Sequence, residues 1–140
     1  MAAIDPSTEF GARVLRHLEQ DQVVWLTTVG PELTPQPSPV WFIWDGDTVL
    51  MFSQPGTPKL RNIGLHPRVS LNFNSTEVGG DVVVLNADAA IDDEAGPADT
   101  HADYIDKYTG GLSTIGMSPE AFALAYSVPV RIRPTNVRGL

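Results

Sequence analysis

Apolar and polar positions along the chain predict short strands over most of its length. The runs Val23 to Val29 and Gln36 to Trp44 are rich in β-branched and aromatic residues, which favours strands. Asp45-Gly46 then separates Trp44 from the apolar run Val49 to Phe52, and an Asp-Gly pair in this position is a strong hairpin signal. The second and third strands are therefore predicted to be antiparallel neighbours.

Three further strands are predicted in the second half of the chain. Val69 to Phe73 alternates apolar and polar residues with period two, the pattern of a half-buried strand. Val82 to Ile91 is long enough to curve around a barrel, and Val128 to Arg133 brings the strands to six. Because the connections are mostly local and no βαβ alternation is present, we predict a small six-stranded antiparallel barrel, mainly β with flanking helices.

Helices are predicted at the ends and in the gaps of this sheet. Asp5 before Pro6 is typical of a helix start, and apolar residues at helical spacing follow as far as Gln20. A second helix is expected over Pro97 to Tyr108 and a third from Ser118 to Tyr126.

Composition limits the function classes. With 140 residues, 42% hydrophobic and 19% charged, the chain suits one globular domain over residues 1–140. A net charge of −8 argues against a nucleic-acid binder, and no cysteine is present to form a disulfide or ligate a metal. No apolar run is long enough for a membrane span, and MAAIDPSTEF lacks the features of a secretory signal. We therefore expect a cytoplasmic protein without membrane or nucleic-acid partners.

The stretch SQPGTPKLRNI, which begins at Ser53, contains the candidate anion site. Thr57 and Pro58 are typical of a helix start, where the N–H groups of Lys59 and Leu60 are expected to lack helical partners. Lys59 places a cation at the positive end of the helix dipole, which costs about 0.3–1 kcal/mol unless an anion offsets it. A phosphate could accept from Ser53, Thr57, Lys59 and the free N–H groups. The spacing alone is equally compatible with a surface helix that carries ordinary basic residues.

Other residues were weighed for chemistry. His17, His66 and His101 have no metal-ligand spacing, so no metal site is predicted. The acidic piece Asp92 to Asp99 is interpreted as a solvated loop, because no apolar neighbour is present to raise a carboxyl pKa. Among the tryptophans, Trp41 is the pocket candidate. Trp25 and Trp44 are expected to belong to the core. No role is assigned to four residues near the C-terminus, Tyr126, Arg131, Arg133 and Arg138.

Four segments in order carry a resemblance to a known family: WLTTVG, PQPSPVWFIWDG, FSQPGTPKLRNI and HPRVSLNF. They resemble the pyridoxamine 5′-phosphate oxidase-like split-barrel superfamily, and more narrowly its actinobacterial branch of F420-dependent oxidoreductases. The resemblance is close over Val23 to Phe73 and looser elsewhere. It implies a six-stranded split β-barrel that forms a homodimer, with one flavin or deazaflavin cofactor in each groove at the subunit interface.

The resemblance also implies which residues hold the cofactor. The phosphate would be held by the segment after the third strand, and the tricyclic ring would lie against the second strand. In this sequence the phosphate segment comprises Ser53, Gln54, Pro55, Thr57 and Lys59, with Arg61 and Asn62 close behind, and the ring segment comprises Pro39, Val40 and Trp41.

The expected function is an F420H2-dependent reductase that transfers a hydride to an unsaturated small molecule, with FMN as the alternative cofactor. A non-catalytic protein that binds or carries F420, FMN or a haem-type tetrapyrrole is the alternative function. Pyridoxamine 5′-phosphate oxidation is not expected, since neutral Pro37 and Ser38 stand where that enzyme has basic residues. No catalytic residue or proton donor is assigned from the sequence.

Overall fold

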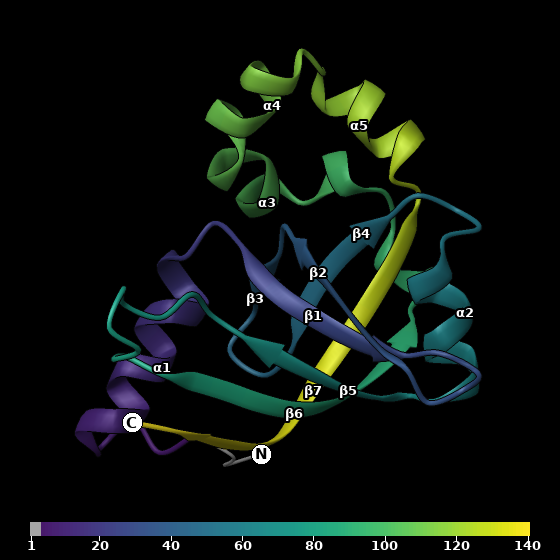
Figure 1. The fold of residues 1–140 in the computed structure, drawn as a ribbon. Helices are drawn as coiled ribbons and strands as arrows, with labels where there is room; N and C mark the ends of the chain where they lie inside the picture. Colours follow the sequence, from purple (N-terminus) through teal and green to yellow (C-terminus); the bar gives the residue numbers. More distant parts are fainter. Residues whose placement is uncertain (1–3) are drawn as a thin grey trace.

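The computed structural model describes residues 4–140 as one antiparallel sheet, curved into a half-barrel, with helices around it (Figure 1). The seven strands follow the order β2-β1-β5-β6-β7-β4-β3. Their bounds are β1 Val24–Val29, β2 Pro35–Val40, β3 Ile43–Trp44, β4 Val49–Ser53, β5 Arg68–Asn72, β6 Val83–Ile91 and β7 Val128–Gly139. The fold is the split barrel that the sequence predicts, with seven strands in place of six.

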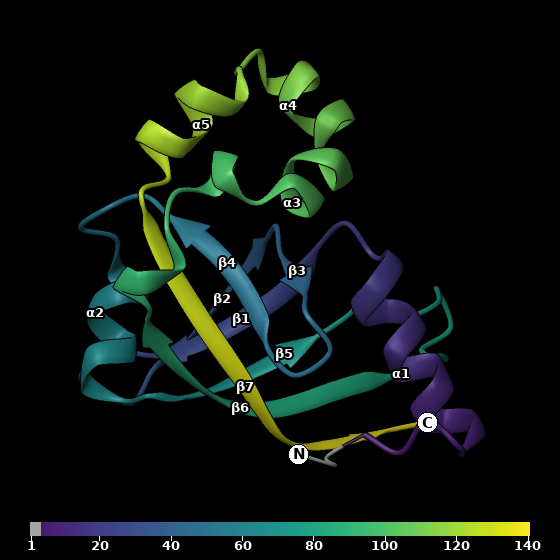
Figure 2. The same ribbon diagram turned by 180° about the vertical axis from the view of Figure 1, so that it is seen from behind.

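Helices flank the sheet on three sides. Their bounds are α1 Glu9–Gln20, α2 Pro58–Leu65, α3 Ala102–Lys107, α4 Thr109–Ile115 and α5 Pro119–Ala125, with short 3₁₀ helices at Asp93–Ala95 and Ala98–Thr100. The helices α1 and α2 lie at opposite sides of the barrel, and α3 to α5 form a cap beyond the ends of β3 and β4 (Figures 1 and 2). No helix in residues 4–140 is long and apolar enough to span a membrane.

The predicted strand Gln36–Trp44 is wrong as a single element, because it is divided into β2 and β3 at opposite edges of the sheet. Phe42, at the break, is fully buried, and its backbone bonds to side chains at the C-terminal end of α3 instead of to a strand. Its N–H donates to the Tyr108 hydroxyl (2.8 Å), and its carbonyl accepts from Lys107 Nζ (3.0 Å). The predicted hairpin itself is confirmed, since Trp44 pairs antiparallel with Val49.

Strand β7 extends six residues beyond the predicted end at Arg133. Its polar second half pairs with β6 as far as Gly139, so backbone pairing outweighs the weak hydrophobic pattern. The register shifts near Pro134, which is a position where proline is tolerated in a strand.

Two helix predictions are wrong in their bounds. The first helix begins at Glu9, with Thr8 as its N-cap, because Asp5 accepts from Ser7 in a preceding turn (2.9 Å to the N–H). The helix predicted from Pro97 is broken at His101 into a 3₁₀ turn and α3. The helix α4 was not predicted, since its consecutive glycines lower helix propensity.

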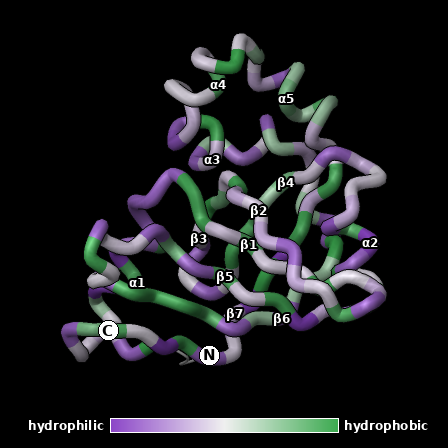
Figure 3. The backbone as a smooth tube through the Cα atoms, in the orientation of Figure 1, coloured by the Kyte–Doolittle hydropathy of each residue, from purple (hydrophilic) through white to green (hydrophobic). Residues whose placement is uncertain are grey.

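Two hydrophobic clusters meet at β4. The larger fills the barrel, and the second lies between β4 and the cap, so all five β4 residues are buried. Since side chains alternate along a strand, Val49 and Met51 face the barrel while Leu50 and Phe52 face the cap. Hydrophobic positions are concentrated in the strands and in parts of the cap (Figure 3). The end of β4 therefore lies at the junction between the barrel and the cap.

Candidate functional site

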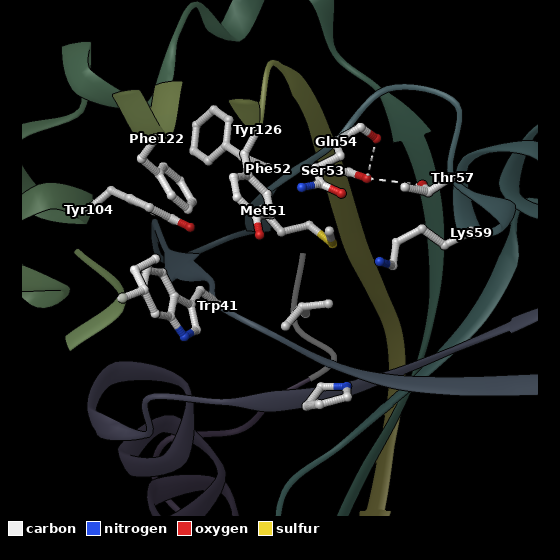
Figure 4. A pocket seen from close by; sticks show the side chains of 13 residues that line it. Trp41, Met51, Phe52, Ser53, Gln54, Thr57, Lys59, Tyr104, Phe122 and Tyr126 are labelled. Atoms are coloured by element: carbon white, nitrogen blue, oxygen red, sulfur yellow. Dashed lines mark hydrogen bonds between the residues drawn. The ribbon is translucent and has the colours of Figure 1, made fainter. Parts of the chain in front are cut away.

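A cavity of about 390 Å³ opens at this junction, within the size range of small-molecule sites. It lies between β2, β4, the start of α2 and the cap (Figure 4). Its lining consists of Pro39, Val40, Trp41, Met51, Phe52, Ser53, Gln54, Thr57, Lys59, Tyr104, Ile115, Phe122 and Tyr126. Seven of the ten sequence-predicted site residues belong to this lining, and Pro55, Arg61 and Asn62 do not.

Two hydroxyl groups lie together at one end of the cavity. Ser53 ends β4, and its Oγ is 3.1 Å from Thr57 Oγ1 and donates to the Gln54 carbonyl at 2.9 Å (Figure 4). Thr57 is the N-cap residue of α2, as predicted, but its side chain makes no capping bond. Its hydroxyl bonds to Ser53 and not to the α2 backbone, so the two hydroxyls would have to exchange these partners to donate to a ligand.

Lys59 is the only charged residue among the described residues that line the cavity. Its side chain points into the cavity from the first turn of α2 (Figure 4), and its ammonium group makes no hydrogen bond or ion pair with another residue within 4–140. The prediction of two free N–H groups is wrong for Leu60, which donates to the Thr57 carbonyl at 3.2 Å. The cationic end thus consists of one ammonium group beside two hydroxyls.

The residues behind Lys59 hold α2 in place. Arg61 donates from Nη1 to the Gly56 carbonyl at 3.0 Å, which closes the turn before the helix. Asn62 is buried, and its Nδ2 donates to Thr28 Oγ1 at 3.0 Å and to Gln36 Oε1 at 2.8 Å. Both side chains are engaged within the fold, so neither is presented to the cavity.

Trp41 forms part of the opposite wall. Its ring stacks on Tyr108, with centroids 4.5 Å apart and planes 7° apart, and also packs against Phe122 at 5.6 Å. A Cβ atom on Gly111 would lie only 2.8 Å from the Trp41 ring, so the close approach of α4 requires a glycine there. The predicted pocket role of Trp41 fits this position, whereas Trp25 lies half-buried outside the core and donates to Asn74 Oδ1.

The cap contributes aromatic lining that the sequence analysis did not assign. Tyr104, Phe122 and Tyr126 face the cavity from α3 and α5, and the Phe122 and Tyr126 rings stack with centroids 4.5 Å apart (Figure 4). Burial raises the pKa of the Tyr104 hydroxyl, so this group stays protonated. The only sequence signal was the spacing of Phe122 and Tyr126 by four residues, which also describes an ordinary buried helix face.

The remaining polar candidates have structural partners. Asp92 caps a 3₁₀ turn and pairs with Arg131 at 3.1 Å, so part of the acidic segment is fixed to β7 and is not a solvated loop throughout. Arg131 also pairs with Asp45 at 3.2 Å, and Arg133 pairs with Asp47. Within residues 4–140 no cluster of three His, Cys, Asp or Glu side chains is arranged to hold a metal ion.

Comparison with known proteins identifies relatives of this fold. Residues 10–139 match the family described as pyridoxamine 5′-phosphate oxidase. Among solved structures, an F420 reductase is 27% identical, with a TM-score of 0.66 over 86% of this chain and 92% of that chain. A conserved hypothetical protein from Mycobacterium tuberculosis is 22% identical (TM-score 0.70, 99% and 86% covered). The heme storage protein HutZ from Vibrio cholerae is 13% identical (TM-score 0.62, 89% and 91% covered). None of the curated proteins matches the sequence.

Proposed function

Because the chain belongs to the pyridoxamine 5′-phosphate oxidase family, we propose that its cavity binds the deazaflavin F420 and that the protein is an F420H2-dependent reductase of unsaturated small molecules. The observation that carries this proposal is one unpaired ammonium and two hydroxyls at one end of a cavity whose other walls are apolar and aromatic. The 27% identity to an F420 reductase over most of both chains supports the same conclusion.

Different lining residues would bind different parts of the cofactor. Lys59, Ser53 and Thr57 provide charge-assisted and neutral hydrogen bonds for a phosphate. Pro39, Val40 and Trp41 provide an apolar surface against which a flat ring system can lie. Asn62 and Arg61 act behind this surface by holding α2 and the turn that precedes it.

The charge at the phosphate end is compatible with either F420 or FMN. A phosphomonoester such as that of FMN carries about −1.5 to −2 at pH 7, whereas the phosphodiester of F420 carries a single negative charge. Lys59 is the only cation that the described residues place in the cavity, because Arg61 is engaged by the Gly56 carbonyl. This one positive charge can pair with a negative charge of either phosphate, so the preference for F420 rests on the 27% identity to an F420 reductase and not on the charge of the site.

In the reaction, bound F420H2 supplies the hydride. The protein's contribution is to fix the positions of the two reactants and to exclude water from the space between them. Met51 and Phe52 are almost fully buried at the base of the cavity, and Phe122 covers it from the cap. These apolar side chains leave water little access to the reacting atoms.

The proposal is tested by titrating the purified protein with F420, FMN and haem in parallel, then screening turnover of unsaturated carbonyl compounds with the reduced form of F420. We expect F420 to bind most tightly and the reduced form to be oxidised in the presence of a substrate. Binding of F420 without any turnover would indicate a carrier protein. Tighter binding of FMN or haem would contradict the assignment of F420.

A further inference from the structure

The Tyr104 hydroxyl is a polar group without a partner. The side chain is fully buried at 0% exposure, and its oxygen makes no hydrogen bond to any of the described residues. Tyr104 lines the cavity, and its hydroxyl end points toward the space between Phe122, Met51 and Trp41 (Figure 4). Buried hydroxyls are nearly always paired, so this one calls for a functional explanation.

Tyr108, which directly follows the helix that carries Tyr104, has a hydroxyl with a clear structural role. Tyr108 is also fully buried, but its hydroxyl accepts from the Phe42 N–H at 2.8 Å and lies 2.7 Å from the Gln22 carbonyl. Its hydroxyl therefore satisfies a backbone group that is left unpaired where the chain breaks between β2 and β3. Tyr104 lies one helical turn earlier and has no equivalent bond, which leaves its hydroxyl available to a molecule in the cavity.

The surroundings of Tyr104 define what it could bind. The nearest rings are those of Phe52, Tyr108 and Phe122, with centroids 5.0, 5.0 and 5.9 Å away. No charged group lines this side of the cavity within residues 4–140, and Lys59 lies across the cavity from Tyr104 (Figure 4). An anion would lose its hydration there without compensation, whereas an uncharged acceptor would gain a hydrogen bond.

We propose that the Tyr104 hydroxyl donates a hydrogen bond to an uncharged acceptor, such as a carbonyl oxygen, on a flat apolar second ligand held between the aromatic side chains of the cap. This inference deepens the proposed function, because it names the class of substrate for the same cavity. The role is that of a binding and orienting residue. The acceptor reaches the buried oxygen when the neighbouring rings move apart around the ligand.

The first test compares two tyrosine variants without any cofactor. Tyr104→Phe removes an unpaired buried hydroxyl and keeps the ring, so we expect the melting temperature to rise by about 3 °C or more. Tyr108→Phe, the matched control, removes a paired hydroxyl from the residue that caps the same helix and should lower the melting temperature. If Tyr104→Phe lowers the melting temperature as Tyr108→Phe does, the Tyr104 hydroxyl is paired in the free protein and the inference is overturned.

The second test uses two probes of nearly equal shape, acetophenone with a carbonyl and ethylbenzene without one, titrated by protein NMR. Tyr104→Phe is expected to weaken acetophenone binding about two- to tenfold and to leave ethylbenzene binding unchanged or tighter. The Tyr108→Phe control should bind both probes with the same affinity as the parent protein. An equal response of both probes to Tyr104→Phe, or no binding of acetophenone to the parent, overturns the inference. Because neither test uses F420, a failure of F420 to bind would be seen separately.

Discussion

The Asn62 side-chain amide donates to Gln36 Oε1 at 2.8 Å and thereby joins α2 to β2. These two elements carry the two halves of the candidate site, with Lys59 on the helix and Trp41 just beyond the strand. The bond is partly buried, and a second bond from the same amide to Thr28 fixes its orientation. The Asn62 side chain therefore holds the cationic end and the apolar wall together, although it does not line the cavity itself.

Removing this amide should damage the fold before it damages any ligand contact. Asn62→Ala leaves the Thr28 and Gln36 acceptors without their donor, and we expect a loss of about 1–3 kcal/mol in the free energy of unfolding. Urea denaturation measures this loss. Asn136→Ala, at an exposed strand position, is the control and should change stability by less than about 0.5 kcal/mol. Equal stability of the two variants would contradict the anchoring role.

Two adjacent glycines of α4 should respond in opposite ways to alanine. Gly111→Ala forces a Cβ atom to within 2.8 Å of the Trp41 ring, which already stacks with Tyr108 and Phe122, so we expect a loss of about 1–3 kcal/mol. Gly110→Ala points into open space and should be neutral or stabilise by up to about 1 kcal/mol. Thermal unfolding of both variants and the tryptophan emission of Gly111→Ala check the prediction. A stabilising Gly111→Ala would show that Trp41 is not confined.

His17 should make stability depend on pH. Burial of its ring lowers its pKa, but hydrogen bonds to Asp81 (2.9 Å) and Asp21 (2.6 Å) outweigh this and raise the pKa above the usual value. A raised folded-state pKa stabilises the protein below the unfolded pKa of about 6.5, and the contribution is lost as pH rises through the folded pKa. At the acid end, Asp81, whose pKa is lowered by its bonds to His17 and Arg13, must be protonated before the pair is lost.

The measurement is the melting temperature of the parent and of His17→Gln between pH 5 and 9. We expect His17→Gln to cost about 1.5–3 kcal/mol near pH 6 and less as the pH rises. Asn136→Ala, which removes no titratable group, is the control and should give a difference that does not vary with pH. A His17→Gln difference that grows with pH would contradict the ionised pairing.

Most strands could be predicted because their signals are local. The alternation in Val69 to Phe73 and the Asp-Gly turn at Asp45 each reflect only neighbouring residues, and both are confirmed within a residue or two. The break at Phe42 could not be predicted, because its cause is a tyrosine and a lysine more than sixty residues away. The extension of β7 to Gly139 likewise depends on pairing with β6 and not on its own composition.

In the candidate site, too, the residues of one local segment could be predicted, and those that depend on tertiary contacts could not. Ser53, Thr57 and Lys59 lie within one short segment whose turn and helix start can be read from sequence, and the structure brings them to one end of the cavity. Arg61 and Asn62 follow in the same segment, but side-chain direction on a short helix turns them to Gly56 and to Gln36. Tyr104 and Phe122 come from the cap, whose placement over β4 is a tertiary contact without a local signal.

The homodimer stays a prediction. Every residue of the edge strand β2 except its last, Val40, is exposed or half-exposed. Three of its six residues are prolines, which cannot donate a backbone hydrogen bond to a further strand. We therefore expect that association does not occur by extension of the sheet from this edge. Sedimentation equilibrium at micromolar concentration should give twice the mass of the chain. A single species with the mass of one chain would contradict the prediction.

The dissociation constant of F420 for the parent and for Lys59→Ala tests the central claim most directly. Lys59→Ala removes the one cation that residues 4–140 contribute to the cavity lining, so we expect affinity to fall about ten- to a hundredfold, equivalent to roughly 1.5–3 kcal/mol. The melting temperature without F420 should be unchanged or slightly higher, because a charge that opposes the helix dipole is removed. Arg61→Ala, two residues further along α2, should weaken binding less, since the Arg61 guanidinium donates to the Gly56 carbonyl. Unchanged F420 affinity in Lys59→Ala would mean that the anion binds elsewhere and would contradict the account.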